Sequence, residues 1–269
     1  MTAPMTGIIW LPPLVRALAT GLIVMSASAV AESLGPFWGA LIASLPVSAG
    51  PAYVFLAMRH GVDFVAASAL SSFAANAATG LFLIVYGILA RRMAPWQGLG
   101  AAVLAWLSAS LATHQVIWTP FMALMLNLGV YGAGFFLLGT VGGTESQAPP
   151  FVPRRRFDLL VRAVAVAAFV SFVVAVSSML GAGATGIAAV FPISLISLIV
   201  IVRPRIGGAA AGLLAANALR SMLGFGMMLL VLHLTIRPWG TATALGAALL
   251  VSVCWSAALL LLRRRQRLA

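Results

Sequence analysis

Two proline–serine pairs contain the residues in this chain whose types and spacing best suit ligand chemistry. Pro46 and Ser48 interrupt one apolar stretch, and Pro192 and Ser194 interrupt another, 146 positions further on (192 − 46 and 194 − 48). A proline inside a helix leaves a carbonyl without its donor, and a nearby serine can satisfy that carbonyl or face a solute. Either pair taken alone is explained by a structural kink in which the serine satisfies its own backbone. Two matching breaks, however, predict a binding site near the membrane midplane.

Three polar residues lie well inside other apolar stretches. Placing the charged side chain of Arg220 inside the membrane costs free energy, so such an arginine normally faces the protein interior or water. We expect it to compensate the charge of an anionic solute, to bond a structural partner, or to snorkel toward an interface. Asn76 and Asn217 each follow two alanines, and we expect them to form interhelical hydrogen bonds or to contact the solute.

Four further charged residues stand near the predicted ends of apolar helices. Arg16 and Arg162 again differ by 146 positions, and we expect them to anchor the chain at the membrane interfaces or to form a basic gate at each mouth. Glu32 and Asp63 are candidates for proton coupling, with ordinary solvated loop charges as the alternative.

The sequence shows no catalytic, cofactor-binding or metal-binding pattern. It contains no Gly-x-Ser-x-Gly, no P-loop and no paired carboxylates within an apolar stretch. The histidines His60, His114 and His233 lack ligand spacing, and Cys254 is the single cysteine. We therefore expect a protein that is not an enzyme and that uses no cofactor or metal.

Composition places these residues in an all-α polytopic membrane protein. Of 269 residues, 62% are hydrophobic and 7% are charged, against about 25% charged residues in soluble domains. The net charge of +12 comes from arginines that lie mostly in short loops, as the positive-inside bias predicts, and no basic stretch is interleaved with aromatic residues. We expect lipid and a small solute as partners and no nucleic acid; a homo-oligomer is compatible with the sequence.

The apolar runs predict about nine transmembrane helices, each long enough to cross a hydrocarbon core of about 30 Å. The segment 96–139 is too long for one crossing at about 1.5 Å per residue, so we divide it at the polar Thr113-His114-Gln115. The predicted helices are 13–30, 37–58, 64–89, 98–112, 116–138, 159–180, 186–202, 207–234 and 241–262.

Matching residues indicate that the chain contains two copies of a four-helix unit. Arg59 recurs as Arg205, and Gly80 recurs as Gly226, both at the offset of 146. Because one extra helix separates the copies, the second copy would point the opposite way, as in the inverted repeats of many secondary transporters. The expected organisation is membrane repeat 1 at 1–114, a linking helix and loop at 115–153, and membrane repeat 2 at 154–269.

The arginine distribution predicts a cytoplasmic C-terminus. With nine helices and that orientation, eleven loop arginines lie inside and two outside. If 96–139 were one element, eight helices would give ten against three and parallel repeats. Charge alone therefore decides little, and the length of 96–139 is the reason for preferring nine helices and an inverted repeat.

The first half of the chain contains, in order, Arg16-Ala17, LGPFWGALIASLPVSAGP and Arg59-His60-Gly61. This order resembles the repeat of the aromatic-acid-exporter and fusaric-acid-resistance superfamily, although Asp63-Phe64-Val65 stands where that family favours Gly-Thr and another glycine. The stretch FPISLISLIVIVR of the second half is similar to GlpM-type inner-membrane proteins. The first resemblance implies a role in transport.

These features together predict a bacterial inner-membrane transporter, either a secondary carrier or an exporter. Its solute would be a small organic anion or an amphipathic molecule, bound near the midplane between the two broken helices. The few carboxylates argue against a cation carrier. The alternative is a non-transporting membrane scaffold or a regulatory subunit of a partner complex, although the short loops offer little docking surface outside the lipid.

Overall fold

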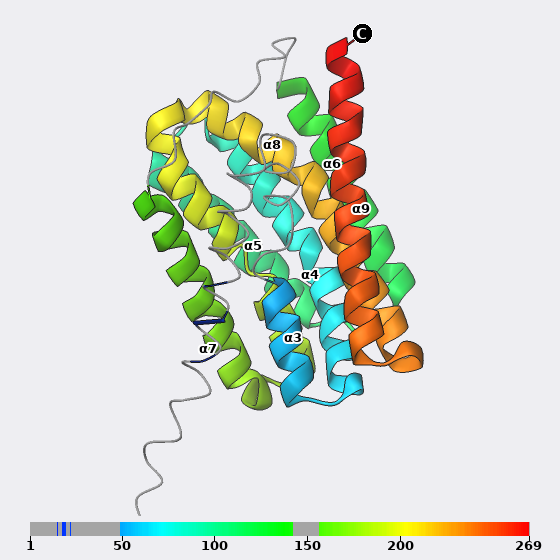
Figure 1. The fold of residues 1–269 in the computed structure, drawn as a ribbon. Helices are drawn as coiled ribbons and strands as arrows, with labels where there is room; N and C mark the ends of the chain where they lie inside the picture. Colours follow the sequence, from blue (N-terminus) through cyan, green and yellow to red (C-terminus); the bar gives the residue numbers. More distant parts are fainter. Residues whose placement is uncertain (1–14, 16–17, 20–21, 23–48, 142–155, 269) are drawn as a thin grey trace, which may run out of the picture.

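The computed structural model describes residues 15, 18–19, 22, 49–141 and 156–268, and every regular element in these ranges is a helix (Figure 1). The predicted all-α class is confirmed for this part of the chain. Most of the predicted helix 13–30 and most of the predicted helix 37–58 lie outside it. The helices are α3 (Ala49–Arg59), α4 (Val62–Leu89), α5 (Pro95–His114), α6 (Pro120–Val141), α7 (Arg156–Ala189), α8 (Ile193–Trp239) and α9 (Thr241–Leu268).

Within the described ranges, four helical stretches are long and apolar enough to cross a membrane. They are Val62–Leu89, Pro120–Gly139, Leu160–Trp239 and Thr241–Leu262. The third contains 80 residues, and Gly181 and Gly207 interrupt its helical backbone with φ of 73° and 77°, a conformation that glycine adopts without steric cost. The chain is therefore a helical, membrane-embedded protein.

The segment 96–139 is divided close to the predicted position. α5 ends at His114 and α6 begins at Pro120. Proline suits the first helical position because its missing N–H would have no partner there. The Thr119 hydroxyl accepts a hydrogen bond from the Met122 N–H at 3.2 Å, so it satisfies another open donor of that first turn. The two helices on either side of this turn are consequently separate elements.

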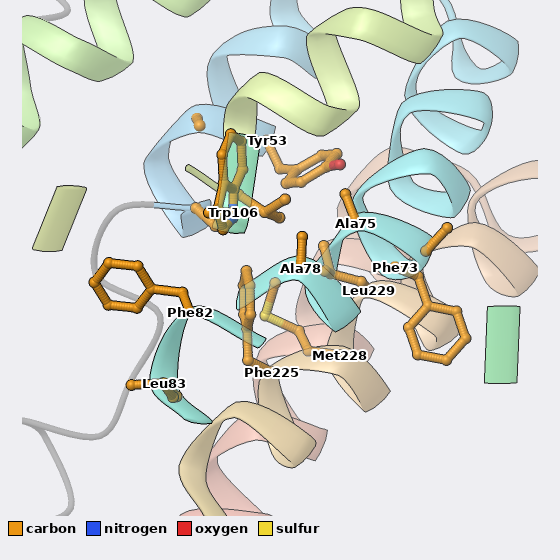
Figure 2. Packing of buried hydrophobic residues seen from close by; sticks show 14 of the residues in the cluster. Tyr53, Phe73, Ala75, Ala78, Phe82, Leu83, Trp106, Phe225, Met228 and Leu229 are labelled. Carbon is orange, nitrogen blue, oxygen red and sulfur yellow. The ribbon is translucent and has the colours of Figure 1, made fainter. Parts of the chain in front are cut away.

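α4 is the central helix of the bundle. In its most apolar window 78% of the residues are buried, compared with 17% in the stretch Thr241–Leu262. α4 contacts α5, α6 and α7, and its most extensive contact is with α8. Figure 2 shows Phe225 and Met228 of α8 packed in the same cluster as Ala78 of α4. Any site that uses the interior of this bundle therefore involves α4.

Small residues allow other backbones to approach α4 closely. A Cβ at Gly186 would lie 2.2 Å from the Ser68 carbonyl oxygen, and a Cβ at Gly208 would lie 2.1 Å from the Ala90 carbonyl oxygen. Such close helix contacts with small residues are characteristic of packing in membranes, where no hydrophobic effect holds helices together. The contacts fix the end of α7 and the part of α8 after Gly207 against opposite ends of α4.

Candidate functional site

A helix break at residues 190–192 lies inside the bundle. The N–H groups of Val190 and Phe191 bond to carbonyls only three residues back, at 3.2 and 3.0 Å, and Pro192 has no N–H. The Gly186 carbonyl thereby loses its usual helical donor. Pro192 is itself buried and precedes the first residue of α8. The predicted interruption at Pro192 is thus present in the structure.

Three hydroxyl groups of α4, which we call the hydroxyl row, satisfy carbonyls next to this break. Ser68, Ser72 and Thr79 have helical spacings of four and seven residues and so share one face of α4. They donate to the carbonyls of Ala182 at 2.9 Å, Gly186 at 2.5 Å and Val190 at 3.3 Å, respectively. These acceptors are one turn apart, so the segment 182–190 runs alongside α4 in the same direction.

Two aromatic side chains add a second layer of hydrogen bonds. The Ser72 hydroxyl already donates to a carbonyl, so the Tyr53 hydroxyl, 2.6 Å away, donates to Ser72. The Trp106 Nε1–H donates to the Thr79 hydroxyl at 3.2 Å. The Trp106 ring also packs edge-on against Phe191, with 5.0 Å between centroids. Tyr53 of α3 and Trp106 of α5, both labelled in Figure 2, thus bond to the hydroxyl row from two other helices.

A pair of buried asparagines, Asn76 on α4 and Asn127 on α6, forms a second polar contact in the bundle. Asn76, at the middle of α4, donates from Nδ2 to Oδ1 of Asn127 on α6 at 3.1 Å and to the Met222 carbonyl on α8 at 3.3 Å. Asn127 donates in turn to the Phe73 carbonyl at 2.8 Å. The predicted interhelical role of Asn76 is consistent with these contacts, which join three helices.

The Asn76 side chain keeps one open acceptor. Its Oδ1 is buried and has no hydrogen-bond partner in the structure, although the residue is only 1% exposed. Leaving a buried polar group without a partner costs about 1–3 kcal/mol. A donor from water or from a bound solute would remove that cost. Asn76 Oδ1, at the middle of α4, is therefore an acceptor that can receive a hydrogen bond from such a donor.

Charged and basic side chains cluster at one end of the bundle, beside the α3–α4 turn, which we call the Arg59 end. Arg59 donates to the Val174 carbonyl at 2.8 Å, and His60 Nε2 lies 2.7 Å from the Ser177 hydroxyl. Burial, and then the neighbouring Arg59 charge, lower the pKa of His60 below its usual value. These contacts tie the α3–α4 turn to the part of α7 that precedes Gly181.

The predicted residues Arg220 and Asn217 bond to each other on α8. Arg220 is exposed on α8 and donates to Asn217 Oδ1 at 3.3 Å. Ser194 is half-buried, and its carbonyl accepts from Ser197 within the same helix at 3.0 Å. Among the predicted residues that the structure describes, Asn76 and Pro192 are thus the ones in the buried centre of the bundle.

The predicted gating and coupling residues fall near the ends of the helices. Asp63 accepts a hydrogen bond from Arg237 Nε at 2.8 Å, and both side chains are largely exposed. Arg162 is half-buried near the start of α7. An exposed ion pair such as Asp63–Arg237 contributes about 0–1 kcal/mol. Pro46, Ser48, Arg16 and Glu32 lie outside the described residues.

Several residues of the site were not predicted. The hydroxyl row was visible in the sequence as a stripe of Ser and Thr on one face of an alanine-rich helix, the composition typical of membrane helix contacts. Asn127 and Trp106 gave no such signal, because their partners lie 51 and 27 residues away. The predicted helices 186–202 and 207–234 leave Arg203 in a loop, whereas the structure buries it at 6% exposure.

The fold and the site define a class: a helical membrane protein with a central helix that carries a buried polar surface beside a broken helix. No protein-family model, curated protein or solved structure matches the chain.

Proposed function

We propose that this chain is a secondary transporter that moves a small organic acid or amphipathic solute along α4. The observation that supports this best is the helix break at 190–192, which lies beside α4 inside the bundle. Broken helices in membranes are tolerated where protein or water satisfies the freed carbonyls, and transporters use them to bind solutes near the midplane. Here Thr79 and Asn76 bring hydrogen-bonding groups to that depth.

An inverted repeat is part of the proposal. The Asn76–Met222 hydrogen bond joins residues 146 positions apart, the same offset that relates the two halves of the sequence. A twofold axis through the α4–α8 crossing would bring equivalent residues into contact in this way. Pro46 and Ser48 would then form the counterpart of the break at Pro192, with solute between the two half-sites.

The charge pattern supports a solute that crosses the centre without net charge. The described side chains that line the middle of α4 are neutral donors and acceptors, such as Asn76, Asn127 and Thr79. Arg220, which could have balanced an anion, is exposed on α8. Bringing an uncompensated carboxylate into such a site costs several kcal/mol. We therefore propose that an organic acid crosses together with a proton.

Uptake by purified protein in liposomes tests the proposal. Radiolabelled 4-hydroxybenzoate and lactate are offered under an inward proton gradient, with protein-free liposomes as the baseline for passive entry. Thr79→Val removes the hydroxyl between Trp106 and the Val190 carbonyl and should lower uptake about fivefold, the effect of about 1 kcal/mol. The matched control is Thr235→Val, because Thr235 bonds only within its own helix, to Val231.

Separate variants test whether the two half-sites and Arg220 contribute to uptake. Ser48→Ala and Ser194→Ala should each reduce uptake if the two broken helices bind solute together, and Arg220→Ala should leave uptake unchanged. A loss of uptake in Arg220→Ala would mean that this arginine, and not a proton, balances the solute charge. If neither solute enters faster than in protein-free liposomes, and Thr79→Val changes nothing, the site proposed beside α4 is wrong.

A second candidate is a non-transporting scaffold or regulatory subunit. Each hydroxyl of the row already donates to a carbonyl, which is the state that a permanent packing contact requires. In that case Ser72→Ala and Thr79→Val would lower the stability of the protein without a transport defect, because there would be no transport to lose. We favour transport because the open Asn76 acceptor has no evident use in a static contact.

The proposal also includes the membrane in which the protein lies and its orientation there. The charge distribution favours the bacterial inner membrane with the Arg-rich C-terminus in the cytoplasm. The end of the bundle that holds Arg91, Arg92, Arg203 and Arg205 would then face the cytoplasm, and the Arg59 end would face the periplasm.

A further inference from the structure

Arg203 is a buried arginine at the end of α4, in a position that the sequence assigned to a loop. It is 6% exposed and lies on α8 four residues before Gly207, where the helical backbone is interrupted. Its Nη2 donates to the Ala90 carbonyl at 2.9 Å and to the Met93 carbonyl at 2.6 Å. Arg203 therefore caps the C-terminal end of α4, a favourable place for a cation.

Capping uses only one of the two terminal nitrogens. Arg203 Nη1 is buried and has no hydrogen-bond partner, and the same is true of the Tyr86 hydroxyl on α4. The two side chains are neighbours, with 6.0 Å between the Arg203 Cζ and the centroid of the Tyr86 ring. Tyr86 is fully buried. Two neighbouring side chains from two helices thus each keep a buried polar atom that meets no acceptor within hydrogen-bond geometry.

The local charge indicates which ligand would use these donors. The two carboxylates in the described part of the chain are both paired with other arginines, Asp158 with Arg205 and Asp63 with Arg237. A water molecule could accept the hydrogen bonds, but it would not balance a buried guanidinium. An oxyanion would do both, because it accepts N–H and O–H donors and carries the opposite charge.

We propose that Arg203 and Tyr86 form a binding site for one small oxyanion, a carboxylate or a phosphate. The two carbonyl contacts hold the guanidinium in place before the ligand arrives, and the close contact of Gly208 with the Ala90 carbonyl holds the neighbouring turn. Such preorganisation reduces the entropy lost on binding. The site stands apart from the proposed transport function, because binding can be read without any movement of solute.

Binding to the purified full-length protein in detergent tests the proposal. Sodium phosphate and sodium benzoate are titrated by calorimetry, with sodium chloride at matched ionic strength as the reference. Tyr86→Phe removes one donor and leaves the α4 cap intact, so its affinity for the bound anion should fall about tenfold or more. Arg203→Lys should lose binding, and Arg91→Gln, which changes an exposed arginine nearby, should bind like the parent.

A second comparison distinguishes free phosphate from a lipid phosphate as the source of the anion. In nanodiscs of phosphatidylcholine alone, free phosphate should bind as in detergent. If the natural ligand is a lipid phosphate, phosphatidylglycerol added to the nanodiscs should compete with free phosphate for the site. Either result supports an oxyanion site. The proposal is overturned if neither anion binds the parent, or if Tyr86→Phe binds with parental affinity.

Discussion

The Asn76 side chain donates a hydrogen bond to the Met222 carbonyl at 3.3 Å, and the two residues are 146 positions apart. That separation equals the offset between Arg59 and Arg205 and between Gly80 and Gly226. In two copies related by a twofold axis, only residues close to the axis contact their own counterparts. The α4–α8 crossing is therefore where we place the axis of the proposed inverted repeat, and Asn76 is the polar residue next to it.

The first prediction concerns Gly186, where α7 approaches α4. A Cβ at this position would lie 2.2 Å from the Ser68 carbonyl oxygen, and backbone cannot move aside as a flexible side chain can. Gly186→Ala should therefore destabilise the protein by about 1–3 kcal/mol. The control is Gly183→Ala, whose nearest atom outside its own segment would be 3.9 Å away. Equal melting temperatures for the two variants in detergent would refute the contact.

The second prediction concerns the coupling between Asn76 and Asn127. A double-mutant cycle with Asn76→Ala and Asn127→Ala should give a coupling free energy of about 0.5–2 kcal/mol, the range for hydrogen bonds between membrane helices. Chemical unfolding in mixed micelles measures it. Asn76→Ala combined with Ser197→Ala should be additive, because Ser197 bonds within its own helix. Additivity in the asparagine cycle would show that their 3.1 Å contact contributes nothing.

The sequence predicted the helical elements well because apolar length and proline positions are local signals. The turn between α5 and α6 falls beside the polar Thr113-His114-Gln115, and the break in front of α8 falls at Pro192. Both follow from residues that cannot continue a buried helix at that point. The site at Asn76 was half predicted: its alanine-flanked amide indicated an interhelical contact, but not the partner on α6.

Other parts of the site depend on contacts between segments far apart in the chain. Arg203 stands in Val202-Arg203-Pro204-Arg205, which has the composition of a cytoplasmic loop, yet its side chain reaches carbonyls 113 and 110 residues away. Arg220 stands inside an apolar stretch but is exposed. Hydropathy gives the depth of a residue along a helix but not which way it faces, and both differences have that origin.

The third prediction concerns the driving force for transport. If an organic acid crosses with a proton past a neutral centre at Asn76 and Thr79, no net charge moves. An inward proton gradient should then drive uptake of 4-hydroxybenzoate, whereas a membrane potential set with potassium and valinomycin at equal pH should not. Uptake that follows the potential instead would require a compensating charge on the path and would contradict the neutral centre.

The fourth prediction concerns His60 and the pH dependence of stability. The Ser177 hydroxyl donates to the Val174 carbonyl, so the His60 ring donates to Ser177 from Nε2. Burial and Arg59 lower the pKa of His60 in the folded protein below its usual value of about 6.5. The unfolded chain therefore takes up this proton first as the pH falls.

The stability that depends on neutral His60 is fully present above about pH 7 and is lost as the pH falls below about 6.5 through the lowered pKa of the folded state. His60→Gln should flatten the fall in melting temperature between about pH 7 and pH 5. The matched control is His114→Gln, since His114 is exposed at the end of α5. Parallel pH profiles for the parent and His60→Gln would contradict the role of burial at this ring.

The last prediction concerns orientation in the membrane. α4 ends just before Arg91-Arg92, α5 and α6 then reverse the chain twice, and Figure 1 shows α6 and α9 ending at the same face of the bundle. Reporter fusions after Arg92, after Arg156 and at the C-terminus should therefore all read cytoplasmic, and a fusion after Gln115 should read periplasmic. A periplasmic signal at Arg92 would place the Arg203 end outside, against the positive-inside rule. It would also favour the eight-helix arrangement with parallel repeats, in which the Asn76–Met222 contact could not mark a twofold axis in the membrane plane.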